Sequence, residues 1–144
     1  MIRPGIADVF RGVAMILHAG DVGGPSILAA LNAIAPTQAV YGNVDDPHDP
    51  ALARERVVTI EGVTIHVSHG HELGQPTPEL VAARYTGDVL VFGHTHKAIT
   101  RRIADRLIVN PGAAGPRRFH LKPSVARLTI ADGRVECETI WLAG

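Results

Sequence analysis

The chain has 144 residues, enough for one domain with a substantial core, and we expect residues 1–144 to form a single domain. Hydrophobic residues make up 46% of it and charged residues 19%, and the 14 Lys and Arg residues balance the 14 Asp and Glu residues. This neutral, globular composition carries no strong nucleic-acid signal and excludes the strongly basic class of polyanion-binding proteins.

In chain order, the first half predicts a strand, helix, strand unit. A short helix over 4–11 precedes an apolar run over 12–21, which reads as a buried strand ending in Gly-Asp. Residues 25–35 carry apolar side chains at helical spacing, and a strand over 37–43 follows. A polar, proline-bearing loop over 44–50 ends this half.

The second half predicts three β-hairpins, over 54–71, 97–110 and 124–142. Two of them contain the dipeptides Glu61-Gly62 and Asp132-Gly133, which favour two-residue turns.

Between the first two hairpins the sequence predicts a helix and a strand. The helix covers 77–85, with Thr77 as its cap and Pro78 at its first position. The strand covers 87–96 and ends in a polar turn, and a Gly/Pro loop over 111–118 separates the last two hairpins.

Cysteine content and hydropathy indicate the cellular compartment of the protein. The single cysteine, Cys137, cannot form an internal disulfide, which favours a reducing compartment. No apolar run approaches the ~18 residues of a membrane helix, and the first residues lack the pattern of a signal peptide. We therefore expect a cytoplasmic protein without a membrane partner. A redox-sensing domain is an alternative supported by Cys137 alone.

Four polar clusters each follow an apolar run directly. They are HAGD with Asp21, YGN with Asn43, SHGH with His69 and His71, and FGHTH with His94 and His96. In an open α/β sheet the strand ends that carry loops meet at one edge, so separate clusters can assemble one site. Carboxylate, amide and imidazole ligands suit Mn, Fe, Zn or Ni, whereas no thiolate is available for a structural zinc site.

Each cluster alone also has an ordinary structural explanation. Histidines at strand ends are often hydrogen-bonded surface residues, and Gly-Asp and Gly-Asn are common turn dipeptides. HGHE resembles the start of a zinc-protease helix, but LGQP follows it without a histidine at the required position, which excludes that motif. The recurrence of all four clusters, each with an adjacent glycine that permits close backbone approach, favours a shared site.

In this order, GD at 20–21, GN at 42–43, HGH at 69–71 and GHTH at 93–96 resemble the calcineurin-like metallophosphoesterase superfamily. The most similar branch is the small bacterial and archaeal phosphodiesterase family, which also resembles the retromer scaffold subunit of eukaryotes. NPGA at 110–113 matches the NPGS loop of that family. The resemblance covers nearly the whole chain and implies an α/β domain of two packed mixed β-sheets flanked by helices.

The resemblance also implies a cofactor and a reaction. Family members bind two divalent metal ions, here Mn, Ni, Fe or Zn, which share a bridging aspartate that corresponds to Asp21. Asn43, His69 and His94 correspond to the remaining protein ligands of the second metal, and His96 to a ligand of the first. The implied reaction is hydrolysis of a small or nucleotide-like phosphoester by a metal-activated water, with Asp21, Asn43 and His94 as candidate catalytic residues.

Further residues are candidates to support the ligands or to contact phosphate: His18, Asp45, His71, Asn110 and Gly112. His18 is the best candidate to orient a ligand, whereas His66 is expected to pack within a strand. Arg117 and Arg118 are expected to be solvated, or to contact a phosphate near the NPGA loop.

The sequence departs from the family at its start. Family members begin with a strand ending in Asp-x-His, which completes the ligand set of the first metal, and this sequence has no such motif. We therefore expect an N-terminally short domain without the first strand, and one complete metal site. Either a longer product carries the motif upstream, or the chain is this short and hydrolyses poorly. Unpaired strand edges would then favour a homo-oligomer.

A second departure lies at Val44, where many superfamily members have a histidine that protonates the leaving group. The small phosphodiesterase branch has GNCD there, and GNVD resembles it through Asp45. Without this acid we expect a preference for good leaving groups, although His71 or His48 could replace it. The rival to the enzyme is a non-catalytic metal-binding scaffold of the same fold.

Overall fold

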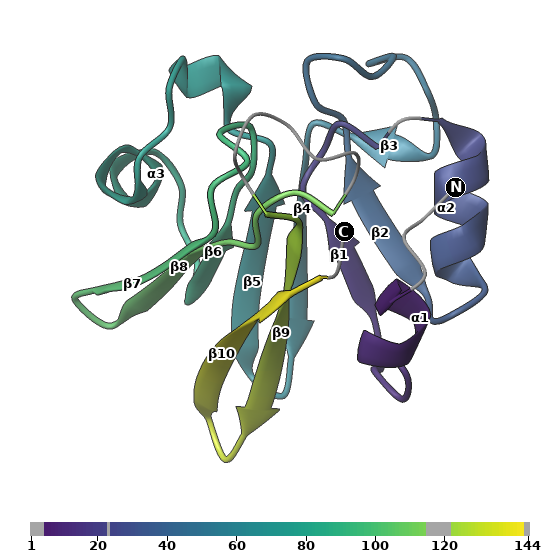
Figure 1. The fold of residues 1–144 in the computed structure, drawn as a ribbon. Helices are drawn as coiled ribbons and strands as arrows, with labels where there is room; N and C mark the ends of the chain where they lie inside the picture. Colours follow the sequence, from purple (N-terminus) through teal and green to yellow (C-terminus); the bar gives the residue numbers. More distant parts are fainter. Residues whose placement is uncertain (1–4, 23, 115–121, 143–144) are drawn as a thin grey trace.

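The computed structural model describes residues 5–22, 24–114 and 122–142 (Figure 1). Its elements in chain order are α1 (Gly5–Val9), β1 (Ile16–His18), α2 (Pro25–Asn32), β2 (Thr37–Val40), β3 (Leu52–Ala53), β4 (Glu55–Ile60), β5 (Val63–Ser68), the 3₁₀ helix η1 (His71–Leu73), α3 (Pro78–Arg84), β6 (Val89–Val91), β7 (Ile99–Ile103), β8 (Arg106–Asn110), β9 (Ser124–Ala131) and β10 (Arg134–Trp141).

A five-stranded mixed sheet forms one layer of the fold, in the order β4-β5-β6-β8-β7. Its three inner strands are parallel and in register, with Ile65 opposite Val89 and Val89 opposite Leu107, whereas β4 and β7 run antiparallel at the edges. All three residues of β6 are buried, so this strand is covered on both faces. That burial explains the uninterrupted apolar run that predicts it.

The second layer consists of two separate sheets. One is the parallel sheet β1-β2-β3, and the other is the hairpin of β9 and β10. Leu17 of β1, Val40 of β2 and Leu128 of β9 all belong to the hydrophobic cluster on the same face of the five-stranded sheet. The predicted pair of packed mixed sheets is therefore confirmed, with one of the two layers divided.

A groove of about 530 Å³ lies between the two parts of this layer. Its walls include Leu17 and Leu128, and its floor includes Ile65 of the five-stranded sheet. Within the described residues β1 pairs only with β2, and β9 pairs only with β10. Both strands therefore present one backbone edge to an apolar groove.

Helices cover the outer faces of the five-stranded sheet and of the parallel sheet (Figure 1). Val81 of α3 and Tyr85, which directly follows α3, pack against Leu90 and Ile108 on the far face of the five-stranded sheet. On the other side, α1 and α2 cover β1 and β2, where a separate apolar cluster joins the two helices to the strand. In the described part of the chain, no helix has the length and apolarity that crossing a membrane requires.

Local turn chemistry is confirmed where the sequence predicts it. Glu61 and Gly62 have φ of 49° and 81°, and Asp132 and Gly133 have φ of 52° and 75°, as type I′ hairpin turns require. The hydroxyl of Thr77 accepts a hydrogen bond from the backbone N–H of Leu80 at 3.2 Å and so caps α3.

One local prediction was wrong, and one strand was missed. The helix predicted to reach residue 35 ends at Asn32, whose amide donates to the carbonyl of Leu28 and accepts from the N–H of Thr37. These side-chain bonds compete with the helical pattern and turn the chain toward β2. In addition, β3 was not predicted, because a two-residue strand has no periodicity of its own.

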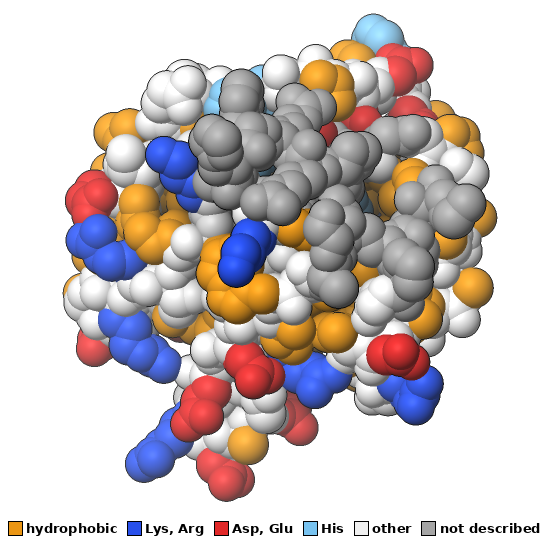
Figure 2. Space-filling model, viewed as in Figure 1, with side chains coloured by type: hydrophobic (Ala, Val, Ile, Leu, Met, Phe, Trp, Pro, Cys, Tyr) orange, Lys and Arg blue, Asp and Glu red, His pale blue; other side chains and the backbone are white. Residues whose placement is uncertain are grey.

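Charged side chains of both signs are visible on the face seen in Figure 2. Basic and acidic side chains are interspersed over the described part of the face in Figure 2. This distribution agrees with the net charge of zero.

Candidate metal centre

The candidate ligands lie where four strands end at one edge of the molecule. Asp21 follows β1, Asn43 follows β2, His69 directly follows β5, and His94 follows β6. Because β1 and β2 are parallel, and β5 and β6 are parallel, each pair delivers its polar residues to a common end.

Three of these side chains converge on Nε2 of His69. This nitrogen lies 3.1 Å from Oδ1 of Asn43, 3.3 Å from Oδ2 of Asp21 and 3.3 Å from Nδ1 of His94. The His69 side chain is only 2% exposed. Donor atoms that share one cation at about 2.1 Å lie about 3.0–3.4 Å apart, so these separations suit joint coordination.

The protonation state of His69 makes this convergence informative. Its Nδ1 lies 2.8 Å from the carbonyl oxygen of Ala19, which can only accept, so Nδ1 carries the proton. Burial lowers the pKa of His69, against the opposing effects of this hydrogen bond and of the Asp21 charge, and favours the neutral ring. Nε2 then presents a lone pair to a carboxylate and an amide oxygen, an arrangement that a cation would stabilise.

The donor set is open in this conformation. Among residues 5–22, 24–114 and 122–142, no group of three or more His, Cys, Asp or Glu side chains is close enough together to hold a metal ion. The three short distances are all measured from Nε2 of His69. One of them leads to the amide of Asn43, which is not one of these four residue types. The donor types fit a divalent cation, but in this conformation they do not close around one, and the number of sites stays a prediction.

Backbone strain is concentrated at these ligands. Asp21, His94 and His96 have φ of 54°, 69° and 62°, in the left-handed region that non-glycine residues rarely adopt. The other described non-glycine residues with positive φ lie in the three hairpin turns. Such strain persists only where the surrounding structure imposes it, and it is common at functional sites.

Two of the motif glycines are required by space. A Cβ atom on Gly42 would overlap the carboxylate of Asp21, and a Cβ on Gly20 would lie 2.5 Å from Nδ1 of His69. Gly42 has an ordinary φ, so what excludes a side chain at this position is Asp21, through its carboxylate and through its backbone nitrogen, both of which the Cβ would overlap. The glycines therefore let backbone and ligand side chains approach one another closely.

Asp45 connects two of the ligand-bearing loops. Its Oδ2 accepts hydrogen bonds from the backbone N–H groups of Val22 and Gly42, both at 2.9 Å. One carboxylate thus ties the turn after β1 to the turn after β2. This geometry agrees with the predicted supporting role of Asp45.

Asn110 holds the turn that carries His94. It is fully buried, and its amide donates to the carbonyl of Gly93 at 3.2 Å and to the Thr95 hydroxyl at 3.0 Å. Its Oδ1 accepts from the N–H of Gly112 at 2.9 Å. These bonds favour the supporting role over a phosphate contact for Asn110.

The remaining histidines differ in their surroundings. His18 accepts a hydrogen bond from the N–H of Gly20 at 3.2 Å, and burial lowers its pKa, against the opposing charges of Asp45 and Asp21. The ring centroid of His71 lies 5.2 Å from that of His69, so His71 borders the centre.

His66 lies outside the centre. Its Nε2 is 2.7 Å from Oε2 of Glu55, and its ring stacks on Tyr85 at 4.5 Å. The expected packing role therefore agrees with the structure. The predictions for Arg117 and Arg118 fall outside the described residues.

Sequence reasoning missed several backbone partners of the site. The carbonyl of Ala19, which orients His69, and the N–H of Val22, which binds Asp45, have no signal in the sequence because any residue type supplies these groups. Thr95, which binds Asn110, was also missed, although its place inside GHTH could have drawn attention to it.

Comparison with known proteins shows the family of the chain. Residues 2–133 match a family model described as "Calcineurin-like phosphoesterase superfamily domain". A probable metallophosphoesterase of Methanothermobacter thermautotrophicus is 35% identical over 144 residues, covering 96% of this chain and 82% of that protein.

Solved structures share the fold. Wild-type Vps29 from Entamoeba histolytica, complexed with Zn²⁺, superposes with a TM-score of 0.78 at 26% identity, covering 98% of this chain and 90% of that one. An archaeal phosphodiesterase gives a TM-score of 0.75 at 21% identity, covering 94% and 88% of the two chains, and supports the fold alone.

Proposed function

The chain belongs to the calcineurin-like phosphoesterase superfamily, and from this premise we propose that it is a metal-dependent phosphodiesterase. The main support is the convergence of Asp21, Asn43 and His94 on the unprotonated Nε2 of His69. We propose that these four residues hold one divalent cation, Mn, Ni, Fe or Zn, and that His96 contributes to a second.

Asp21 and His69 would contribute charge and orientation to phosphoester hydrolysis at this site. A bound divalent cation would polarise phosphoryl oxygens and lower the pKa of water. Asp21 supplies the negative charge that offsets the cation. The hydrogen bond from His69 to Ala19 fixes the ring so that only Nε2 faces the other ligands.

The leaving group receives little help from this chain. Val44 follows the ligand Asn43 and is 63% exposed, and its side chain carries no proton to donate. We therefore propose small or nucleotide-like phosphoesters with good leaving groups as substrates, because these depart without protonation.

A non-catalytic scaffold of the same fold is the second candidate. The observation that favours it is the likeness to Vps29, with a TM-score of 0.78 at 26% identity. A scaffold would keep the fold without needing metal-dependent turnover, so the two candidates differ in one measurable property.

The deciding measurement is hydrolysis of bis-p-nitrophenyl phosphate with added Mn²⁺ or Ni²⁺. The wild type should be active only with metal, and His94→Ala should lose at least about 100-fold, the upper range for losing a residue that merely supports a ligand. Lys97→Ala, an exposed neighbour in the chain, is the matched control and should stay active. Equal rates with and without metal, or in wild type and His94→Ala, would overturn the enzyme proposal.

Metal stoichiometry tests the ligand assignment separately. One complete ligand set predicts one firmly bound equivalent of Mn²⁺ per chain in a calorimetric titration. Two equivalents at high occupancy would contradict the prediction of a single complete site.

A further inference from the structure

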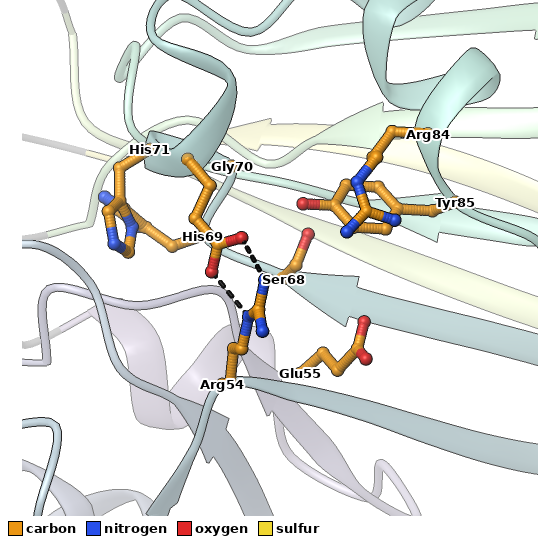
Figure 3. A pocket seen from close by; sticks show the side chains of 9 residues that line it. Arg54, Glu55, Ser68, His69, Gly70, His71, Arg84 and Tyr85 are labelled. Atoms are coloured by element: carbon orange, nitrogen blue, oxygen red, sulfur yellow. Dashed lines mark hydrogen bonds and ion pairs between the residues drawn. The ribbon is translucent and has the colours of Figure 1, made fainter.

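A small polar pocket lies beside the metal centre and shares the segment 69–71 with it (Figure 3). Its volume is about 60 Å³. The side chains that matter for its chemistry are Arg54, Glu55, Ser68, Glu72, Arg84 and Tyr85. None of them belongs to the ligand set described above, so the pocket is a separate feature of the same edge.

Ser68 is a buried hydroxyl in need of a partner. The residue is 4% exposed, and its Oγ has no hydrogen-bond partner among the described residues. In Figure 3 this hydroxyl points into the space between Arg54 and Tyr85. The Oγ atom is itself buried, so water does not reach it in this conformation, and an unsatisfied buried hydroxyl costs about 1–3 kcal/mol. A ligand hydroxyl that reached Ser68 would remove that cost.

The two arginines of the pocket are used differently. Arg54 binds the Glu72 carboxylate with two hydrogen bonds, at 2.7 and 2.5 Å. Arg84 instead lies over the ring of Tyr85, with Cζ 5.3 Å from its centroid, and makes no hydrogen bond to another residue in the described part of the chain. Arg84 therefore retains donors for a ligand.

Acceptors are present as well. Oε2 of Glu55 pairs with His66 at 2.7 Å, which leaves Oε1 of Glu55 as an acceptor at the pocket. The lining carries two arginines and two glutamates, so its formal charge is balanced and an anion gains little from it. A hydroxyl group both donates and accepts, and so matches a lining that offers Arg84, Ser68 and Glu55 together.

The size of the pocket limits the ligand. One water needs about 10–15 Å³ of such space, so the pocket holds about four water-sized groups. Two adjacent carbons with their hydroxyls fill that space, whereas a nucleobase does not fit. We propose that this pocket binds the vicinal diol of a sugar or glycerol group attached to the phosphoester. The proposal rests on the proposed function for the reaction at the neighbouring centre.

Two matched substrate pairs test the proposal. The glyceryl ester of p-nitrophenyl phosphate is compared with the propyl ester, and uridine 5′-(p-nitrophenyl phosphate) with its 2′,3′-dideoxy analogue. The diol member of at least one pair should have a kcat/KM higher by ~10-fold, the effect of about 1.4 kcal/mol. The pair that responds distinguishes glycerol from ribose as the source of the diol.

Ser68→Ala removes only the hydroxyl and should bring the ratio within each pair close to one. Its activity on bis-p-nitrophenyl phosphate, which has no hydroxyl group, should stay unchanged. Arg84→Met keeps a long side chain and should reduce the same ratio. A ratio near one in the wild type for both pairs, or an unchanged ratio in Ser68→Ala, would overturn the proposal.

A binding measurement separates this proposal from the proposed function. Glycerol phosphate and propyl phosphate are titrated into the ¹⁵N-labelled protein, and the backbone amide signals of Ser68 and Arg84 are followed. Tighter binding of glycerol phosphate that disappears in Ser68→Ala supports the pocket even if no ester is hydrolysed. Equal binding of both phosphates contradicts it even if the protein is an active phosphodiesterase.

Discussion

The metal centre and the polar pocket beside it share the segment 69–71 but are held in different ways. At the metal centre the backbone sets the geometry, through positive φ at Asp21 and His94 and through a glycine against the Asp21 carboxylate. At the pocket, flexible charged side chains set the geometry. The side chains of Arg54 and Glu72 are 59% and 34% exposed. Substitutions at the centre should therefore cost far more than substitutions at the rim of the pocket.

Gly42→Ala should have the largest effect. Its methyl group would overlap the Asp21 carboxylate, which must then leave its position. We expect Mn²⁺ affinity to fall by at least ~100-fold and the free energy of unfolding to fall by about 1–3 kcal/mol, measured by calorimetric titration and by denaturant unfolding. Gly5→Ala, whose new methyl would meet only a side chain at 3.8 Å, is the control. Unchanged Mn²⁺ affinity in Gly42→Ala would contradict the view that the backbone sets the geometry of the metal centre.

Asp45→Ala should have the next largest effect. The substitution releases the N–H groups of Val22 and Gly42, so the turns that carry Asp21 and Asn43 lose their link. Mn²⁺ affinity should fall by about 10–100-fold. The Mn²⁺ affinity of Asp45→Asn should lie between those of Asp45→Ala and the wild type.

The control for Asp45→Ala is Asp46→Ala, which removes a carboxylate whose only hydrogen bond within the described residues comes from the exposed N–H of His48. Melting of the metal-free proteins separates positioning from folding. If Asp45→Ala lowered the Tm of the metal-free protein and left Mn²⁺ affinity intact, its role would be structural alone.

A pH dependence of stability should follow from His18. Burial lowers its pKa below the value of about 6.5 in the unfolded chain. Below that pH the unfolded chain takes up a proton that folded His18 does not, so stability is present above about pH 6.5 and falls as the pH is lowered. We expect a loss of up to about 1 kcal/mol between about pH 7.5 and pH 5.5 for the metal-free protein.

Chemical unfolding at the two pH values measures this loss. His18→Asn keeps an acceptor for the N–H of Gly20 and cannot titrate, so its loss should be smaller than that of the wild type. Identical losses in the two proteins would show that His18 does not contribute.

The smallest effect is expected at the Arg54–Glu72 pair. Because both side chains are partly exposed, water screens the pair, and a double-mutant cycle with Arg54→Ala and Glu72→Ala should give only a small coupling. The Arg101–Glu79 pair, with side chains 47% and 57% exposed, is the matched comparison. A coupling several times larger at Arg54–Glu72 would mean that the pocket is as firmly held as the metal centre.

Local features of the fold could be predicted from the sequence. The turns at Glu61-Gly62 and Asp132-Gly133 were predicted because the dipeptides themselves favour positive φ. β3 could not be predicted, because its two residues become a strand only by pairing with Ala39 and Val40 of β2. Such pairing depends on contacts distant in sequence.

The sequence identified four residues that the structure brings together, but it did not show which contacts hold them in place. Strand-end motifs identified Asp21, Asn43, His69 and His94, and the structure brings these four together. The unpartnered hydroxyl of Ser68 was invisible in the sequence, because a serine at the end of a strand usually finds a partner.

The sequence by itself determined the family, the longer strands and helices, and the residue types at the strand ends, because these depend on local pattern and spacing. Only the tertiary structure decided why Gly42 must be a glycine, which nitrogen of His69 faces the other ligands, and how Asp45 joins two loops. These properties depend on atoms that meet across strands far apart in the chain. Nearly every residue type carries the same backbone carbonyl and N–H, so the hydrogen-bond partner of such a group depends on the folded structure and not on the residue type.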